Sequence, residues 1–170
     1  MPSEPGPDGP DLAGRQVVVS YSRTGTTRRV ADDLVERLAS PERLSIEPTT
    51  ERRYANWLLR SFVPGATVPI EPIRTDLGAA DALFLGSPKW TLSCPPVTAF
   101  VNRLRAEGVP AGLFVTYGGF DERRFARSLA GRMREAGADL QAKLLVERDA
   151  VGGREYESGL EAFLDAVVDG

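Results

Sequence analysis

The chain has 170 residues, of which 42% are hydrophobic and 26% charged, with a formal net charge of −3, as in one ordinary globular domain. It contains no histidine and one cysteine, which excludes histidine-based catalytic triads, an internal disulfide, and zinc or iron–sulfur sites built by protein side chains alone. The mild net charge gives no electrostatic reason to expect binding to nucleic acid or to an anionic membrane.

The first fourteen residues are rich in proline, glycine and acidic side chains. This composition predicts a disordered tail over 1–14, followed by a single domain over 15–170. The tail lacks the basic start and apolar run of a secretory signal, and no later stretch is apolar over eighteen residues. We therefore expect a cytoplasmic protein without a membrane span. Arginine outnumbers lysine 19 to 2, a bias typical of GC-rich bacterial genomes.

From residue 15 onward, short apolar runs alternate with segments that repeat apolar residues every three or four positions. The apolar runs predict five strands, at 16–20, 44–47, 82–85, 112–116 and 140–146. The periodic segments predict five helices, at 25–40, 51–62, 97–104, 123–136 and 156–168. The proline-rich stretch 63–77 is predicted to be an irregular connection. Strands separated by helix-length connections require a parallel sheet with helices on both faces.

In such an open sheet the ligand binds beyond the carboxyl ends of the strands. The segment after the first strand reads Tyr21-Ser22-Arg23-Thr24-Gly25-Thr26-Thr27, and five of its seven side chains carry a hydroxyl. Hydroxyls and the free N–H groups of the following helix are donors for a phosphate, and a glycine lets the backbone approach closely. Arg23 adds positive charge there, whereas Arg28 and Arg29 are expected on the solvated helix face. The alternative is an ordinary threonine-capped turn.

The third strand exits into a segment with a candidate stacking residue. Its candidate site residues are Ser87, Pro88, Lys89 and Trp90. Trp90 either stacks on an aromatic ligand or anchors the loop in the core, and we favour stacking. Lys89 either lies near the ligand or is solvated. Cys94 follows and is expected to be a small packing residue, because no base adjoins it in the sequence.

The fourth strand exits into a glycine-containing segment. Its candidate site residues are Thr116, Tyr117, Gly118 and Gly119. Two glycines directly after a strand suit a backbone that passes close to the edge of a ring. An ordinary strand-to-helix turn is the alternative. The segment after the first strand contains neither GxGxxG nor the Walker pattern, so a dinucleotide or nucleoside triphosphate site is not expected there.

The loop after the first strand resembles the phosphate loop of the flavodoxin family, [ST]-x-T-G-x-T, with Ser22, Thr24, Gly25 and Thr27 at the defining positions. The resemblance extends over about 15–170. It implies a flavodoxin-like three-layer α/β sandwich with a five-stranded parallel sheet of order 2-1-3-4-5. The unbroken fifth strand is similar to that of the short-chain members. The implied cofactor is FMN, with its phosphate in this loop and its ring between the other two exits.

The resemblance assigns cofactor-binding roles only, with no catalytic side chain and no metal, because the flavin supplies the redox chemistry. The implied function is electron transfer between redox partner proteins. One alternative is a small FMN-dependent NAD(P)H or quinone-type reductase. Many carriers of the family are strongly acidic around the flavin, so the modest net charge and the five arginines of 123–134 weaken the carrier interpretation and leave room for the reductase. A second alternative is a flavin-free interaction module with the same fold. The oligomeric state is not predicted.

Overall fold

The sheet contains five parallel strands in the order β2-β1-β3-β4-β5, which confirms the predicted 2-1-3-4-5 topology. The computed structural model describes residues 12–49, 54–73 and 77–170. Its strands are β1 (Gln16–Ser20), β2 (Pro41–Ser45), β3 (Ala82–Pro88), β4 (Pro110–Tyr117) and β5 (Asp139–Glu147). Its helices are α1 (Thr26–Arg37), α2 (Tyr54–Ser61), α3 (Pro95–Arg103), α4 (Glu122–Glu135), the 3₁₀ turn η1 (Arg148–Ala150) and α5 (Arg154–Val168).

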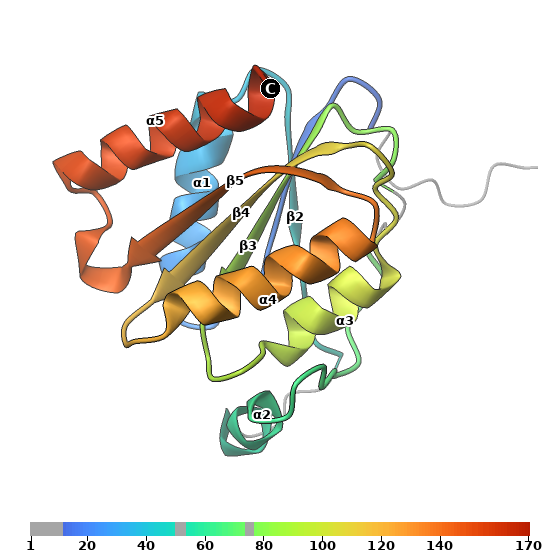
Figure 1. Cartoon of the computed structure of the whole chain (residues 1–170), viewed down its shortest axis with the longest axis vertical. Coiled ribbons are helices and arrows are strands. Elements are labelled where there is room, and N and C mark those ends of the chain that lie inside the picture. The colour runs from blue at the N-terminus through green and yellow to red at the C-terminus, as the bar shows by residue number, and fades with distance from the viewer. Residues whose placement is uncertain (1–11, 50–53, 74–76) are drawn as a thin grey trace, which may run out of the picture.

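Helices cover both faces of this sheet (Figure 1). Helices α1 and α5 pack on one face, and α3 and α4 pack on the other, with α2 beyond one end of the second layer. The apolar run of β1 follows from this arrangement: Val17 and Val19 belong to the core under α3 and α4, whereas Val18 belongs to the core under α1 and α5. A strand that is covered on both faces needs apolar side chains on both. The predicted three-layer sandwich is therefore confirmed.

The second strand lies at 41–45 rather than at the predicted 44–47. It is an edge strand that pairs with β1 alone among the described strands, from Pro41 opposite Gln16 to Ser45 opposite Ser20. Proline is tolerated at the first residue of an edge strand because its missing N–H costs no interior hydrogen bond. The prediction included Ile46 because it is apolar. Its side chain is buried, but it lies just after the end of the strand.

The other predicted boundaries differ by a few residues. Helix α1 ends at Arg37 rather than at residue 40, because Leu38 is already extended. Strand β3 continues past Leu85 to Pro88, and these added residues pair with β4. Position 86 within that strand requires glycine, because the Phe114 ring occupies the space that a Cβ would need.

Three predicted segments lie partly outside the described residues. Of the predicted helix 51–62, residues 51–53 lie outside them, and the described helix α2 is Tyr54–Ser61. The predicted tail, 1–14, is described only from Leu12, which is fully buried in the core and whose carbonyl accepts the Arg15 N–H. In the predicted irregular connection, 63–77, the described residues form no helix or strand, apart from an isolated antiparallel bridge between Ile70 and Pro48. Among the described helices, none is long and apolar enough to cross a bilayer.

Helix α5 packs directly on the backbone of β4 at Gly112. A Cβ on Gly112 would lie 2.6 Å from Cζ of Phe163, which is closer than real Cβ contacts. We predict that Gly112→Ala lowers the free energy of unfolding by about 1–3 kcal/mol through overpacking. Gly131→Ala is the matched control, because a Cβ there meets nothing within 4 Å. It sits inside α4 and should stabilise the protein by about 0.5–1 kcal/mol. Urea unfolding of both variants measures the difference, and equal effects would contradict this packing.

Candidate functional site

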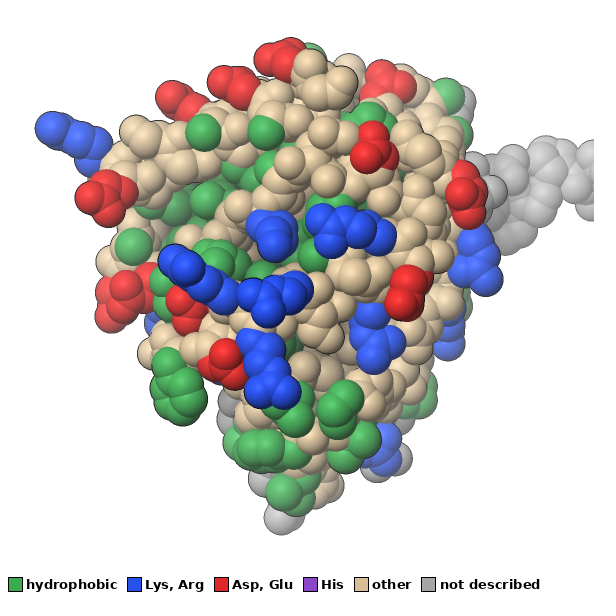
Figure 2. All heavy atoms as spheres, viewed as in Figure 1, with side chains coloured by type: hydrophobic (Ala, Val, Ile, Leu, Met, Phe, Trp, Pro, Cys, Tyr) green, Lys and Arg blue, Asp and Glu red, His purple; other side chains and the backbone are tan. Residues whose placement is uncertain are grey.

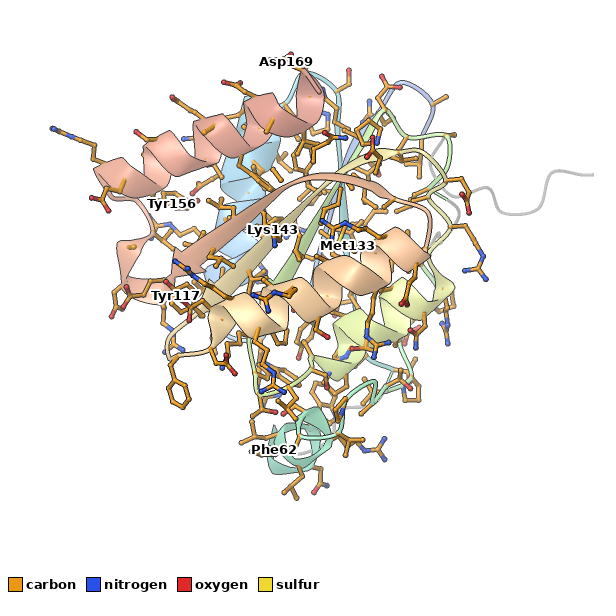
Figure 3. The ribbon with its side chains drawn as sticks, in the orientation of Figure 1. Phe62, Tyr117, Met133, Lys143, Tyr156 and Asp169 are labelled. Atoms are coloured by element: carbon orange, nitrogen blue, oxygen red, sulfur yellow. The ribbon has the colours of Figure 1, made fainter. Side chains whose placement is uncertain are left out.

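The segments that follow β1, β3 and β4 meet at the carboxyl edge of the sheet, and we call them the first, third and fourth exits. They line one cavity of about 320 Å³. The cavity lies at the point where the strand order reverses, between β1 and β3, which is where open parallel sheets bind ligands. Ten of the predicted site residues line it: Arg23, Thr24, Thr26, Thr27, Pro88, Lys89, Trp90, Thr116, Tyr117 and Gly118. Figure 3 shows one of them, Tyr117, near the carboxyl end of β4.

The first exit folds into a cradle at the start of α1. Gly25 has φ 98°, in the left-handed region that favours glycine, and a Cβ there would meet nothing within 4 Å. The Ser22 hydroxyl accepts the Gly25 N–H at 3.1 Å, so Ser22 shapes the loop instead of lining the cavity. No side chain caps α1, and its first turn contains no acidic residue. The cradle therefore presents backbone and hydroxyl donors without a competing carboxylate.

A buried hydroxyl pair joins this cradle to the fourth strand. The Oγ1 atoms of Thr27 and Thr116 lie 2.7 Å apart, and both residues are buried. The third exit is attached to the same strand, because the backbone N–H of Lys89 donates to the Thr116 carbonyl at 2.8 Å. Thr116 thus connects all three exits at a fixed relative position.

The third exit carries an aromatic cluster. The Trp90 ring stacks against Trp57 of α2, with centroids 6.1 Å apart and planes 26° from parallel. Trp90 also meets the ring of Tyr21 edge-on at 5.6 Å. The Arg23 guanidinium carbon lies 5.8 Å from the centroid of the Trp57 ring. These contacts make an amphipathic aromatic surface beside the cavity.

The structure gives Trp57 a place at the site that the sequence prediction missed. Trp57 was visible in the sequence only as one apolar position of a helical stripe. Its side chain is buried, and its indole Nε1 has no hydrogen-bond partner among the described residues. Trp57 does not line the cavity itself, and it contributes to the site by packing behind Trp90.

The three remaining predicted site residues and Cys94 lie around the cavity rather than in its wall. Ser87 is fully buried, and its hydroxyl donates to the Pro88 carbonyl at 2.9 Å. Gly119 is exposed and does not line the cavity, and Gly25 contributes only its backbone conformation. Burial raises the pKa of the Cys94 thiol to about 12, so the thiol stays protonated at neutral pH and does not act as a thiolate nucleophile.

Tyr21 is also a neutral group in this environment. Burial is the main reason that its pKa rises to about 12, and the neighbouring Cys94 adds to the rise, while Arg23 opposes it. The phenol therefore keeps its proton at physiological pH. It can pack against Trp90 without placing a negative charge beside the cavity.

Arg148 also lines the cavity, and the sequence prediction missed it. It is the first residue after β5, a strand exit that was not considered because it lies away from the point of strand-order reversal. With Arg23 and Lys89 it gives the cavity three cationic side chains, and among the described residues no acidic one lines it. Figure 2 shows that Lys and Arg side chains also gather on the molecular face over α4 and β5.

Comparison with solved structures places this architecture among the flavodoxin-like proteins. A provisionally named flavoprotein of Bacteroides eggerthii has a TM-score of 0.70 and 22% identity, covering 89% of this chain and 97% of its own. A flavodoxin of Streptococcus pneumoniae has a TM-score of 0.62 and 16% identity, covering 92% and 99%. A Lactobacillus acidophilus flavoprotein in complex with FMN has a TM-score of 0.58 and 14% identity, covering 89% and 99%. The chain has the flavodoxin-like fold.

The chain also has a relative that is similar in sequence. The chain is 37% identical over 147 residues to an uncharacterised protein of Archaeoglobus fulgidus, covering 86% of this chain and 92% of the relative. The chain belongs to one family with that protein. The sequence matches no model of a described protein family.

The hydroxyl pair offers a direct test of how the exits are connected. Thr27→Val leaves the buried Thr116 hydroxyl without its partner, and we expect this to cost about 1–3 kcal/mol of unfolding free energy. The double variant Thr27→Val/Thr116→Val removes both hydroxyls and should cost less than the sum of the two single changes. Urea unfolding of the four proteins gives the coupling energy. Strict additivity would mean that the two hydroxyls do not bond in solution.

Proposed function

We propose that the chain binds one FMN non-covalently and transfers electrons between redox partners. The observation that supports this most strongly is the cradle at the start of α1. It combines an uncapped helix N-terminus, a left-handed glycine and threonine hydroxyls at the switch point of a flavodoxin-like sheet. Such a cradle suits a phosphomonoester, because many neutral donors share its charge.

The residues present fit the phosphate of FMN. Thr24, Thr26 and Thr27 line the cavity beside the start of α1, and within residues 12–49, 54–73 and 77–170 no carboxylate lines it to repel an anion. The hydrogen bond from the Gly25 N–H to Ser22 holds the loop in shape. The cavity volume of about 320 Å³ falls at the lower end of the range for small-molecule sites, about 300–1,000 Å³.

The aromatic cluster fits the ring of the same cofactor. Trp90, Pro88 and Tyr117 border the cavity, and Trp57 packs on Trp90. A flat heteroaromatic ring gains stacking energy from such surfaces. When bound, FMN supplies one- and two-electron redox chemistry. The protein's own part is to bind and orient the ring and to shield it from water.

A reductase that acts on a small substrate is the second candidate function. It is favoured by one observation, the three cationic side chains Arg23, Lys89 and Arg148 in the cavity wall. Positive charge at a cavity mouth attracts an anionic electron donor such as NAD(P)H as well as a cofactor phosphate. The acceptor would be a quinone or a similar small molecule.

Two measurements on the purified protein separate these functions. Identifying a released flavin by its visible spectrum and mass tests the cofactor itself, and a protein that takes up no FMN would be the flavin-free interaction module. Rapid oxidation of NADPH or NADH with a small quinone would assign the reductase. Reduction that requires a separate reductase protein would assign the carrier.

The position of the phosphate is tested at Thr24, an exposed residue of the cradle. We predict that Thr24→Glu weakens FMN binding about 100-fold, because a carboxylate in the cradle repels the phosphate. Thr24→Gln, similar in size but neutral, is the matched control and should lose much less affinity. Titration of the apoprotein with FMN, followed by flavin fluorescence, gives the dissociation constants. If Thr24→Glu bound FMN as tightly as the unchanged protein, the phosphate would lie elsewhere.

A further inference from the structure

Arg148 lies where the fifth strand ends, and its guanidinium rests against the fourth exit. It begins η1, the single turn that follows β5. An ideal Cβ built on Gly118 would lie 2.7 Å from Nη2 and 3.1 Å from Cζ of Arg148. The absence of a side chain at Gly118 is therefore what makes room for the guanidinium. Gly118 and Arg148 both line the cavity.

The connection that carries Arg148 also adjoins the start of α1. A Cβ on Gly152, four residues further along this connection, would lie 3.0 Å from Nη2 of Arg29 in the first turns of α1. Gly118 is two residues beyond Thr116, whose hydroxyl bonds to Thr27. Arg148 itself lines the same cavity as Thr24, Thr26 and Thr27 of the cradle.

Arg148 differs from the other cationic residues near the cradle. Arg29 is directed toward Gly152, and Arg28 lines a small separate pocket near β2. Arg23 lies against the Trp57 ring, on the aromatic side of the cavity. Among the described residues, no acceptor forms a hydrogen bond or an ion pair with the Arg148 side chain. Its donors therefore remain available to a ligand.

We propose that Arg148 is an additional phosphate-binding residue, which supplies the cradle with a cationic fork and makes the site select phosphorylated flavins over riboflavin. The proposal rests on the proposed function, since the phosphate in question is that of FMN. A planar guanidinium pairs with two phosphate oxygens at once, and such charge-assisted bonds are stronger than bonds from neutral donors. Neutral hydroxyls and N–H groups position the phosphate, and Arg148 balances its charge.

The test compares FMN with riboflavin, which lacks the phosphate, on the apoprotein of the full chain. Arg148→Gln should weaken FMN binding roughly tenfold and leave riboflavin binding unchanged. The dependence of FMN affinity on salt should also become shallower, because one charge pair is lost. Arg148→Lys should restore part of the loss. The matched control is Arg154→Gln, an exposed arginine at the start of α5 that does not line the cavity, and it should change neither affinity.

Three other results would contradict the role of Arg148, and they differ in what they mean for the proposed function. Unchanged FMN affinity in Arg148→Gln, with FMN still bound by the unchanged protein, would refute the role of Arg148 and leave the proposed function standing. Equal losses for FMN and riboflavin would show a general effect on the site and would also refute that role, and thermal unfolding of the variant would show whether it remains folded. If the unchanged protein bound neither flavin, the proposed function and the role of Arg148 would both fail.

Discussion

The site depends on the register with which three parallel strands end at one edge. Ser20, the last residue of β1, pairs with Gly86 of β3, and Gly86 pairs with Phe114 of β4. Because the strands are aligned at these positions, the segments that follow them leave the sheet at neighbouring points. Two hydrogen bonds to Thr116, one from Lys89 and one with Thr27, then fix the exits to one another. A shift in this register would separate the cradle from the aromatic cluster.

The cavity contains two chemically different regions because different strand exits build them. The start of α1 contributes hydroxyls and backbone donors, and the segment after β3 contributes the indole of Trp90, which packs on Trp57. A ligand that fills both regions must be ionic at one end and aromatic at the other. The two arginines of the cavity wall contact different segments, since Arg23 lies near the Trp57 ring and Arg148 lies against Gly118 after β4.

Much of this could be predicted from the sequence, because local signals determine it. The apolar runs and the helical periodicity identified all five strands and all five major helices, and the hydroxyl-rich loop located the cradle. The edge strand β2 was misplaced, because Ile46 is buried without being part of the strand. The positions of Trp57 and Arg148 depend on contacts between distant segments. Neither the packing of α2 on Trp90 nor the meeting of the β5 exit with Gly118 leaves a local signal.

The stacked indoles have a spectroscopic consequence. The chain has two tryptophans, and both belong to the aromatic cluster beside the cavity. The rest of the core, formed largely by Phe, Leu and Val side chains, contains no third indole. The intrinsic tryptophan emission of this protein therefore originates at one place, and it reports on the surroundings of that cavity rather than on the molecule as a whole.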